Sequence, residues 1–480
     1  MVNIRRSLVI NFLSSSGATI AQFFVSMILA RMLSPSEIGV FSMTIVFVNI
    51  AHIFRDFGVG TYLQSEPELT PEKMRAATGV MFSTSWLIAV LLYLASDWIG
   101  IWFKEAAMAP VMKVLAIGFV FIPFGSITHS LLTREFEAGK QAIVYVVGTS
   151  AYAITCLTLA YLGFGTMSMA WANLANIVAC AIAYAPLRPK HLPWMPSFRN
   201  WRRVVHFGIG NLLSNCLGAV NNAAPDILLG KLGNASLVGL FSRASSTVGI
   251  FGYIAGGTVT YGSLSYISQA HHRGEPVGPL LNRTTALLTG IGWPALALTF
   301  VFGREIVLAL YGEKWLPSVP AISGLVAAGM ISMIFNYTAI AVTAIGRPYL
   351  AAGPVIVVLL TRVIFGFLLF DGGIESFSWV ICIATIASAP IMIMQHHVYL
   401  RHRLTTLLIA LVPSALVSII CAASAWLLKM MLPPSLPAMA TLLILAAPLA
   451  TIWYLALRLT NHPLTNELHH LASGLRARYA

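Results

Sequence analysis

The amino-acid sequence predicts an all-α polytopic membrane protein with about 14 transmembrane helices. Of its 480 residues, 58% are apolar and only 9% are charged, whereas a soluble chain has about 45–50% apolar and about 25% charged residues. Apolar runs of about 20 residues recur along the chain, and each is long enough to span a bilayer as a helix. The runs are continuous rather than alternating, which favours helices over barrel strands.

The first apolar run, residues 8–30, is too long for a signal peptide and lacks a convincing cleavage site, so we expect it to be retained as a helix. The five cysteines lie inside apolar runs without a CxxC pair, which is typical of small buried residues, and no metal site is expected. The predicted spans are residues 8–30, 38–63, 76–96, 110–132, 141–162, 165–185, 204–229, 237–265, 284–303, 318–343, 349–370, 376–398, 405–428 and 437–458.

The distribution of Lys and Arg predicts the orientation of these helices. With the N-terminus in the cytoplasm, the cytoplasmic segments hold 19 Lys and Arg residues and the outer segments hold six. This is the asymmetry of the positive-inside rule. A missed helix would reverse the side assigned to every later segment and would reduce the asymmetry. Both termini are therefore expected in the cytoplasm. Anionic lipid at the inner surface accounts for the net charge of +13, so nucleic acid is not expected as a partner.

An internal repeat predicts how the helices are grouped. "ARMLSPSEIGVFS", starting at Ala30, returns as "GKLGNASLVGLFS", starting at Gly230, with an offset of 200 and no gap. Both copies fall at the outer turn between the first and second helix of a six-helix unit. Six is even, so both units enter from the cytoplasm and form a parallel repeat, as in transporters that rock one half against the other. Over residues 29–42 the identical pairs are Leu29/Leu229, Ser36/Ser236, Gly39/Gly239, Phe41/Phe241 and Ser42/Ser242.

The repeat leads to a prediction of the domain organisation. Two parallel six-helix lobes are followed by an extra helix pair. In the repeated turn, Ser34 can cap the helix that starts at Pro35, and Gly39 and Gly239 allow helices to approach closely. The predicted segments are 1–187 for the N-terminal lobe, 188–203 for a basic cytoplasmic linker, 204–398 for the C-terminal lobe, 399–458 for the helix pair and 459–480 for a cytoplasmic tail.

Two stretches carry a resemblance to a known family. "LARMLSPSEIGVFSM" and "FRDFGVGTYLQ" contain Leu-Ser-Pro after a helix that ends in Arg, and then Asp-x-Gly-x-Gly before Gln. They resemble the opening of the polysaccharide (O-antigen/exopolysaccharide) flippase family. That family belongs to the multidrug/oligosaccharidyl-lipid/polysaccharide transporter superfamily, with lipid II flippases and drug antiporters. The motif positions here are Arg31, Leu33, Ser34, Pro35, Glu37, Gly39, Asp56, Gly58, Gly60 and Gln64.

The resemblance implies a secondary transporter rather than an enzyme. It would flip an undecaprenyl-pyrophosphate-linked oligosaccharide across the bacterial inner membrane by alternating access, around a cationic central cavity. The extra helix pair would help to form a groove for the lipid tail. No cofactor is implied, and H⁺ or Na⁺ are candidate coupling ions. The implied partners are the lipid-linked oligosaccharide, the membrane, and a polysaccharide polymerase with chain-length and export proteins.

Charged residues inside the predicted spans are candidate site residues, because each costs about 2.5–3.5 kcal/mol at mid-helix. They are Arg55, Asp56, Lys113, Asp226, Arg243 and Arg362. Lys113, near a helix end, is expected to snorkel to the surface. Arg55, Arg243 and Arg362 are predicted to bind pyrophosphate, because guanidinium matches phosphate oxygens and stays charged when desolvated.

The two acidic residues have either a coupling or a structural role. The Asp-x-Gly-x-Gly that starts at Asp56 suggests a helix end, and Asp226 could instead pair with Arg243. The repeat-related Arg31 and Lys231 would attract anions at the exit or simply anchor the interface. Asn221 and Asn222, beside Pro225, predict a polar interruption of their helix and a binding site there.

The sequence bears on four alternative functions. The sequence has no Gly-x-x-x-x-Gly-Lys-Ser/Thr loop, so the chain is not an ATP-driven pump by itself. A polysaccharide polymerase or ligase usually needs a large outer loop, whereas each predicted outer loop here has about 16 residues or fewer. A drug/cation antiporter should present acidic groups, but four of the six intramembrane charges are basic. A lipid II flippase handles the same pyrophosphate and stays open as an alternative.

Overall fold

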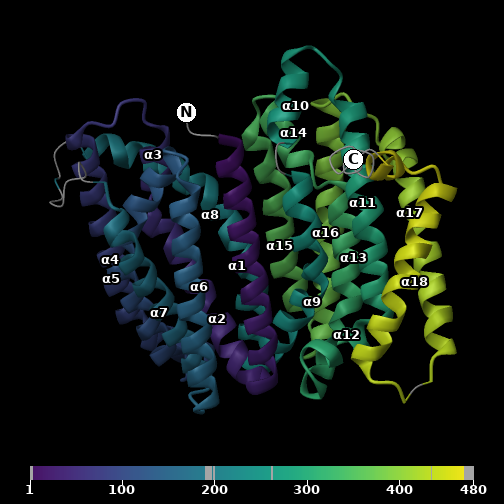
Figure 1. Cartoon of the computed structure of the whole chain (residues 1–480), viewed down its shortest axis with the longest axis horizontal. Helices are drawn as coiled ribbons and strands as arrows, with labels where there is room; N and C mark the ends of the chain where they lie inside the picture. Colours follow the sequence, from purple (N-terminus) through teal and green to yellow (C-terminus); the bar gives the residue numbers. More distant parts are fainter. Residues whose placement is uncertain (1–3, 190–196, 198–200, 261–262, 434, 470–480) are drawn as a thin grey trace, which may run out of the picture. The chain divides into compact units, whose positions relative to one another are not determined.

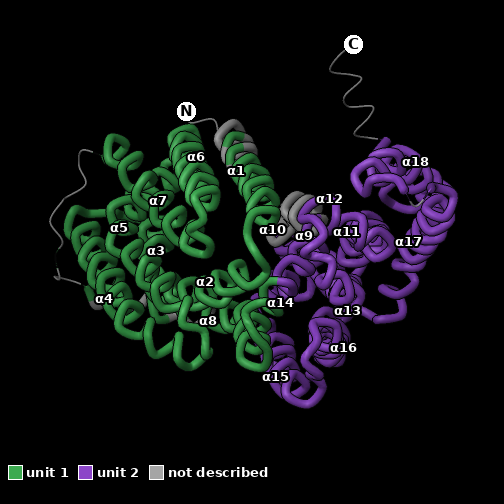
Figure 2. The backbone as a smooth tube through the Cα atoms, turned by 90° about the horizontal axis from the view of Figure 1, so that it is seen from below, with its two compact units in different colours: residues 1–239 green, residues 240–480 purple. Residues whose placement is uncertain are grey.

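The computed structural model describes residues 4–189, 197, 201–260, 263–433 and 435–469, and these residues form helices and no strand. The chain divides into two compact units, Met1–Gly239 and Leu240–Ala480, coloured green and purple in Figure 2. The predicted lobe boundary at 188–203 stays a prediction, and residues 190–196 and 198–200 of it lie outside the described residues. The same holds for residues 470–480 of the predicted tail.

Unit 1 is a bundle of long helices joined by short turns (Figure 1). Its helices are α1 (Ile4–Met32), α2 (Pro35–Asp56), α3 (Val59–Ser65), α4 (Pro71–Phe103), α5 (Met108–Arg134), α6 (Ala138–Tyr161), α7 (Thr166–Tyr184), the 3₁₀ turn η1 (Ala185–Leu187) and α8 (Trp201–Leu232). The first residues of α9 (Ala235–Thr260) also belong to this unit.

Unit 2 contains the rest of α9 and a second set of helices. They are α10 (Ser263–His272), α11 (Val277–Val301), α12 (Gly303–Leu310), η2 (Glu313–Ser318), α13 (Ala321–Ile334), α14 (Thr338–Ala344), η3 (Pro348–Ala351), α15 (Ala352–Leu369), α16 (Ile374–Val398), α17 (Leu404–Met431) and α18 (Ala438–Leu459).

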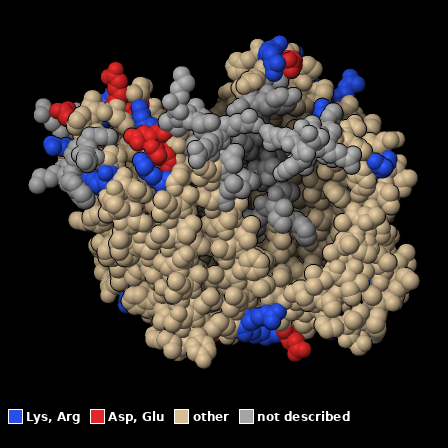
Figure 3. Space-filling model, viewed as in Figure 1, with Lys and Arg blue, Asp and Glu red and all other residues tan. Residues whose placement is uncertain are grey.

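The helices confirm a polytopic membrane protein. Among the described residues, 11 helices are long and apolar enough to cross a membrane. On the face drawn in Figure 3, most of the visible Lys, Arg, Asp and Glu side chains gather towards the upper and lower edges, and the tan surface between them is largely uncharged. Each of the 14 predicted ranges overlaps a helix, although the count of 14 transmembrane spans stays a prediction.

Two of the predicted helices are wrong as continuous helices. The range 38–63 is split, because Phe57 (φ 43°) and Gly58 (φ 66°) adopt the left-handed conformation between α2 and α3. Glycine tolerates this conformation, and it ends a helix. The range 318–343 is split into α13 and α14 at residues 335–337. The first break follows the charged residues Arg55 and Asp56, whereas the second lies in a long apolar run where hydropathy gives no sign of it.

The repeated turn forms matching helix starts. Ser34 Oγ accepts a hydrogen bond from the backbone of Glu37, and the Glu37 carboxylate accepts one from the backbone of Ser34 at 2.7 Å. This capping box satisfies two free N–H groups at the start of α2. At the position offset by 200, Asn234 Oδ1 accepts from the backbone of Leu237 at the start of α9. The predicted cap is therefore confirmed, and its repeat partner makes an equivalent cap with a different residue.

The two glycines of the repeat meet backbone to backbone. A Cβ added to Gly39 would overlap the carbonyl oxygen of Ala235, and one added to Gly239 would overlap that of Pro35. The first turns of α2 and α9 therefore cross where neither residue has a side chain, as predicted from the sequence.

Candidate functional site

A polar cavity of about 390 Å³ lies in unit 1 beside the break between α2 and α3. We call it the α3 cavity. Four helices meet around it, because α5 packs against α2, α3 and α7. Its walls combine one cation and one anion with hydroxyl, amide and imidazole groups. The lining side chains with polar atoms are Arg55, Asp56, Thr61, Gln64, Ser126, His129, Ser130, Asn176 and Tyr184.

Arg55 is placed in this cavity by the last turn of α2. Its Nη1 donates to Ser126 Oγ of α5 at 3.1 Å and approaches Met81 Sδ at 3.8 Å. A cation in the last turn of a helix also interacts favourably with the helix dipole. The carbonyl of Arg55, which cannot be bonded within α2, accepts from Thr84 Oγ1 of α4 at 2.9 Å. Both side-chain contacts use Nη1, and within the described part of the chain no carboxylate forms a hydrogen bond or ion pair with this arginine.

Asp56 is the last residue of α2, as the Asp-x-Gly-x-Gly pattern predicted, and its side chain lines the same cavity. In the described part of the chain no hydrogen bond or ion pair holds its carboxylate, and Arg55 does not pair with it. Gly60 keeps this side of the cavity open. A Cβ there would lie 3.3 Å from Ser130 Oγ and 3.5 Å from Asp56 Oδ1, so a larger side chain would intrude between the two groups.

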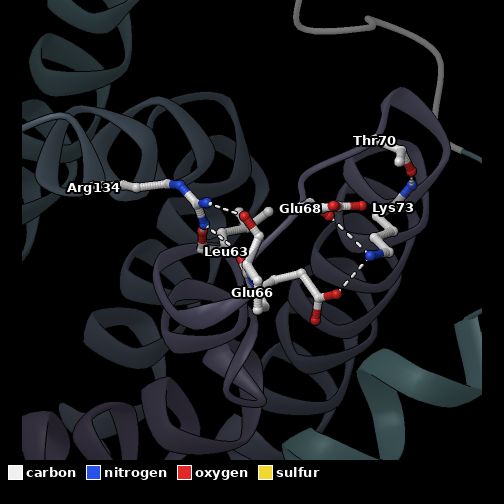
Figure 4. A network of polar contacts seen from close by, with 7 residues as sticks. Leu63, Glu66, Glu68, Thr70, Lys73 and Arg134 are labelled. Atoms are coloured by element: carbon white, nitrogen blue, oxygen red, sulfur yellow. Dashed lines mark hydrogen bonds and ion pairs between the residues drawn. The ribbon is translucent and has the colours of Figure 1, made fainter.

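The C-terminal end of α3 is held by two cations (Figure 4). Arg134 of α5 donates to the carbonyls of Leu63 and Pro67, each at 3.0 Å, and to that of Glu66. Lys73 of α4 forms an ion pair with the Glu66 carboxylate at 2.6 Å and donates to the Glu68 carbonyl at 2.9 Å. These bonds satisfy carbonyls at the end of α3 that have no helical partner. They fix the helix that supplies Gly60, Thr61 and Gln64 to the cavity.

A second cavity of about 550 Å³ lies in unit 1 between α2 and α8, and we call it the α8 cavity. Asn215, Asn222 and Asp226 line it from one stripe of α8, since seven and four residues separate them. Asn49 of α2 faces the same space. Asp226 is the charged residue in this lining, so the α8 cavity is an acidic, amide-lined site, unlike the α3 cavity.

The predicted interruption at Asn221 and Asn222 is wrong, because α8 runs from Trp201 to Leu232 through both of them. Pro225 lacks only the N–H that would bond to the carbonyl of Asn221. Asn221 is not in the lining of the α8 cavity, because it lies about 100° around the helix from Asn222.

The other predicted phosphate ligands lie elsewhere. Arg243 of α9 is in unit 2, with its guanidinium 5.7 Å from the ring centroid of Tyr311. Arg362 is half-buried in the middle of α15. The chamber between lobes that would unite these arginines with Arg55 stays a prediction, as does an ion pair of Asp226 with Arg243.

The cations at the outer turn differ from each other. Lys231 donates to the carbonyl of Trp102 at 2.8 Å, and its Nζ lies 4.6 Å from the centroid of that indole ring. These contacts favour the interfacial anchor over the anion site. Arg31 is exposed in the last turn of α1. Lys113 forms an ion pair with Asp97 at 2.8 Å, which agrees with its expected place near the surface.

Sequence reasoning missed most of the uncharged polar residues of the α3 cavity. His129 Nδ1 lies 2.9 Å from Tyr184 Oη, which joins α5 to α7 across the cavity wall. Ser126 and Ser130 lie four residues apart on one face of α5, whereas Asn176 is a single amide in the apolar run of α7, and no spacing along the chain connects it with them. Two signals marked the site in the sequence: the intramembrane charges of Arg55 and Asp56, and the motif of the resemblance, which contains Gly60 and Gln64.

Comparison with solved structures identifies the fold. The fold resembles "Lipid II flippase MurJ, inward closed conformation" with a TM-score of 0.76 and 13% identity, over 96% of this chain and 99% of that chain. It also resembles an inward-facing multidrug resistance MATE family transporter, with a TM-score of 0.63 and 15% identity, over 79% of this chain and 94% of the other. The chain therefore shares the fold of these two proteins.

Sequence comparison identifies the family. Residues 28–320 match the family described as "Polysaccharide biosynthesis protein", which is more than half of the chain, so the protein belongs to this family. "Teichuronic acid biosynthesis protein TuaB" of Bacillus subtilis (strain 168) is 23% identical over 352 residues, 71% of each protein. "Lipopolysaccharide biosynthesis protein WzxC" of Escherichia coli (strain K12) is 20% identical, over 64% of this chain and 63% of that one. The protein is thus a multi-pass membrane protein of a polysaccharide biosynthesis family.

Proposed function

We propose that this protein flips an undecaprenyl-pyrophosphate-linked oligosaccharide from the cytoplasmic to the periplasmic leaflet of a bacterial inner membrane. The product would serve the assembly of O-antigen, capsule or exopolysaccharide by a polymerase and chain-length and export proteins. Family membership supports the glycan substrate. The observation that carries the proposal is the α3 cavity, where Arg55 lies among hydroxyl and amide groups inside an apolar bundle.

The chemistry of the α3 cavity suits a sugar diphosphate. A pyrophosphate diester carries two negative charges, which a guanidinium binds with charge-assisted hydrogen bonds. Ser126 and Met81 use only Nη1 of Arg55, so Nη2 remains for a phosphate oxygen. Gln64, Asn176 and Tyr184 can bond to sugar hydroxyls. The lipid tail needs no polar site, because it can stay in the bilayer.

Transport would proceed by alternating access, with the headgroup passing from Arg55 to the arginines of unit 2. Arg243 and Arg362 are the proposed later contacts. Arg31 and Lys231 at the repeated turn are the proposed exit cations. A proton or sodium ion would couple at the acidic α8 cavity, where Asp226, Asn215 and Asn222 offer oxygen atoms. Asp56 is the second candidate for a coupling carboxylate.

The decisive experiment measures flipping of the purified lipid-linked oligosaccharide in proteoliposomes. Arg55→Gln is expected to lower the rate at least about tenfold, because a hydrogen bond to a charged group is worth about 1.5–3 kcal/mol. Arg55→Lys should retain part of the rate. Gly60→Leu should also slow transport, because it fills the α3 cavity beside Asp56. The control is Arg75→Gln, which removes an exposed arginine at the start of α4.

Parental transport rates in both Arg55→Gln and Gly60→Leu would contradict the proposal. A lipid II flippase is the second candidate, because the fold resembles that of MurJ and the two substrates share the pyrophosphate. Measuring the transport of lipid II in the same vesicles distinguishes the two candidate functions. The proposed function requires faster transport of the oligosaccharide lipid than of lipid II.

A further inference from the structure

A large cavity in unit 2 plays no part in the proposed transport route. It has a volume of about 920 Å³ and lies where α11 and α17 begin and α16 ends. We call it the α11–α17 cavity. These helices are among the candidate membrane spans, so the cavity lies at the membrane interface. The positive-inside expectation places this interface on the cytoplasmic side. The charged and polar lining residues are His271, Glu275, Asn282, Arg347, Tyr399, Arg401, His402, Arg403 and Thr406.

Three arginines give this cavity a positive charge. Arg347, Arg401 and Arg403 are exposed, and among the described residues none has an ion pair with a carboxylate. Arg347 lies over the Tyr399 ring at 5.0 Å from the centroid, which holds its guanidinium at the wall. The one acidic residue of the lining, Glu275, pairs with Arg273 at 3.4 Å. Within the described part of the chain, no carboxylate therefore neutralises the charge of the three arginines.

Two helices point their positive ends at the same space. Val277 and Gly278, the first residues of α11, line the cavity, and so does Arg403, the residue before α17. In neither helix does a side chain cap the first turn. The two helices pack against each other, and Gly278 allows the close approach, because a Cβ there would lie 2.8 Å from the His402 ring. Uncapped N–H groups and parallel helix dipoles favour an anion.

We propose that the α11–α17 cavity binds a phosphate group, with the headgroup of an anionic phospholipid as its source. The arginines supply planar donors that match phosphate oxygens, and the helix starts supply backbone N–H groups. The position at the ends of membrane spans is where headgroups lie, and basic pockets between such helices bind anionic headgroups. Occupation of this site would join α11, α16 and α17 on this side of unit 2.

The test measures lipid binding to the full-length protein in detergent, by native mass spectrometry and by the lipid-induced rise in Tm. Phosphatidylglycerol is compared with phosphatidylcholine. The variant carries both Arg401→Gln and Arg403→Gln. The control is Arg304→Gln, which removes an exposed arginine in the first turn of α12, beyond the far end of α11. The preference for phosphatidylglycerol should fall at least about tenfold in the double variant and stay parental in the control.

Two further measurements complete the test. An unchanged Tm without lipid shows that the double variant is folded. Inorganic phosphate added at millimolar concentration distinguishes the sources, since displacement of the lipid supports a site for free phosphate, and retention supports the lipid headgroup. An equal preference in the parent and the double variant, or no preference for phosphatidylglycerol in the parent, would overturn the proposal. None of these readouts depends on transport.

Discussion

At the residue scale, two buried histidines outside the membrane spans couple stability to pH. His462, after α18, is 1% exposed and accepts the backbone N–H of Leu464 at Nδ1, so its proton lies on Nε2, 2.9 Å from Ser414 Oγ. His402, between α16 and α17, contacts His396 and Thr406. Burial lowers the pKa of both imidazoles, because it disfavours the charged form.

The first prediction follows from the direction of these pKa shifts. Near pH 6.5 and below, these histidines bind more protons in the unfolded chain than in the folded protein, because their pKa is lower in the folded protein. The free energy of unfolding should therefore fall as the pH drops below about 6.5, and these groups should contribute nothing to the pH dependence above it. His462→Asn, which keeps an acceptor for Leu464, should reduce the loss of Tm between pH 7.5 and 5.5. An unchanged loss of Tm in this variant would contradict the assignment.

At the scale of elements, the break between α2 and α3 and the crossing of α2 with α9 shape unit 1. The break turns the chain at Phe57 and Gly58, so that α3 faces α5 and closes the α3 cavity. The crossing at Gly39 and Gly239 brings two backbones together without side chains. Both features depend on residues of the resembling motif, which explains why a short pattern carried so much of the inference.

The second prediction tests the crossing of α2 with α9. Gly39→Ala should lower the Tm strongly, because the added methyl group would overlap the carbonyl oxygen of Ala235. This oxygen belongs to the backbone of α9, which cannot move aside as a side chain can. Overpacking of this kind costs about 1–3 kcal/mol or more. Gly17→Ala is the matched control, since an added Cβ meets nothing within 4 Å there, and alanine is a better helix former than glycine. Equal Tm values for both variants would show that the crossing tolerates a side chain.

At the scale of the whole molecule, the Lys and Arg distribution determines the expected orientation in the membrane. The inner segments carry 19 of these residues and the outer segments six. Insertion follows this asymmetry, since positive segments stay in the cytoplasm. The 11 candidate spans of the described chain agree with a multi-pass protein, and the orientation itself is a prediction.

The third prediction concerns this orientation. In a cysteine-free background, Ala106→Cys and Ser435→Cys lie in exposed turns that are predicted to face outwards, and Glu68→Cys lies in one predicted to face the cytoplasm. A membrane-impermeant maleimide added to spheroplasts should label the first two and spare the third. Detergent-permeabilised cells, in which all three should react, are the control. The reverse pattern would invert the orientation and place the α11–α17 cavity on the outer side.

Much of the fold could be predicted from local signals. Apolar runs marked the helices, Ser34 marked a helix start, and Asp56 with Gly58 marked a helix end. These features depend on a few adjacent residues, so the sequence contains them. The break at residues 335–337 contains a single turn-forming residue, Asn336, without the glycine that accompanies the first break.

The sequence by itself therefore determined the class of protein, the helix positions, the repeat and the intramembrane charges. Only the tertiary structure decided which residues share a cavity, as with Arg55 and Ser126, which are 71 residues apart. The physical reason is that lipid and protein interior are equally apolar, so hydropathy does not distinguish them. Ile101 is 77% exposed on the surface and Leu115 is 1% exposed in the core, yet both are ordinary members of an apolar run.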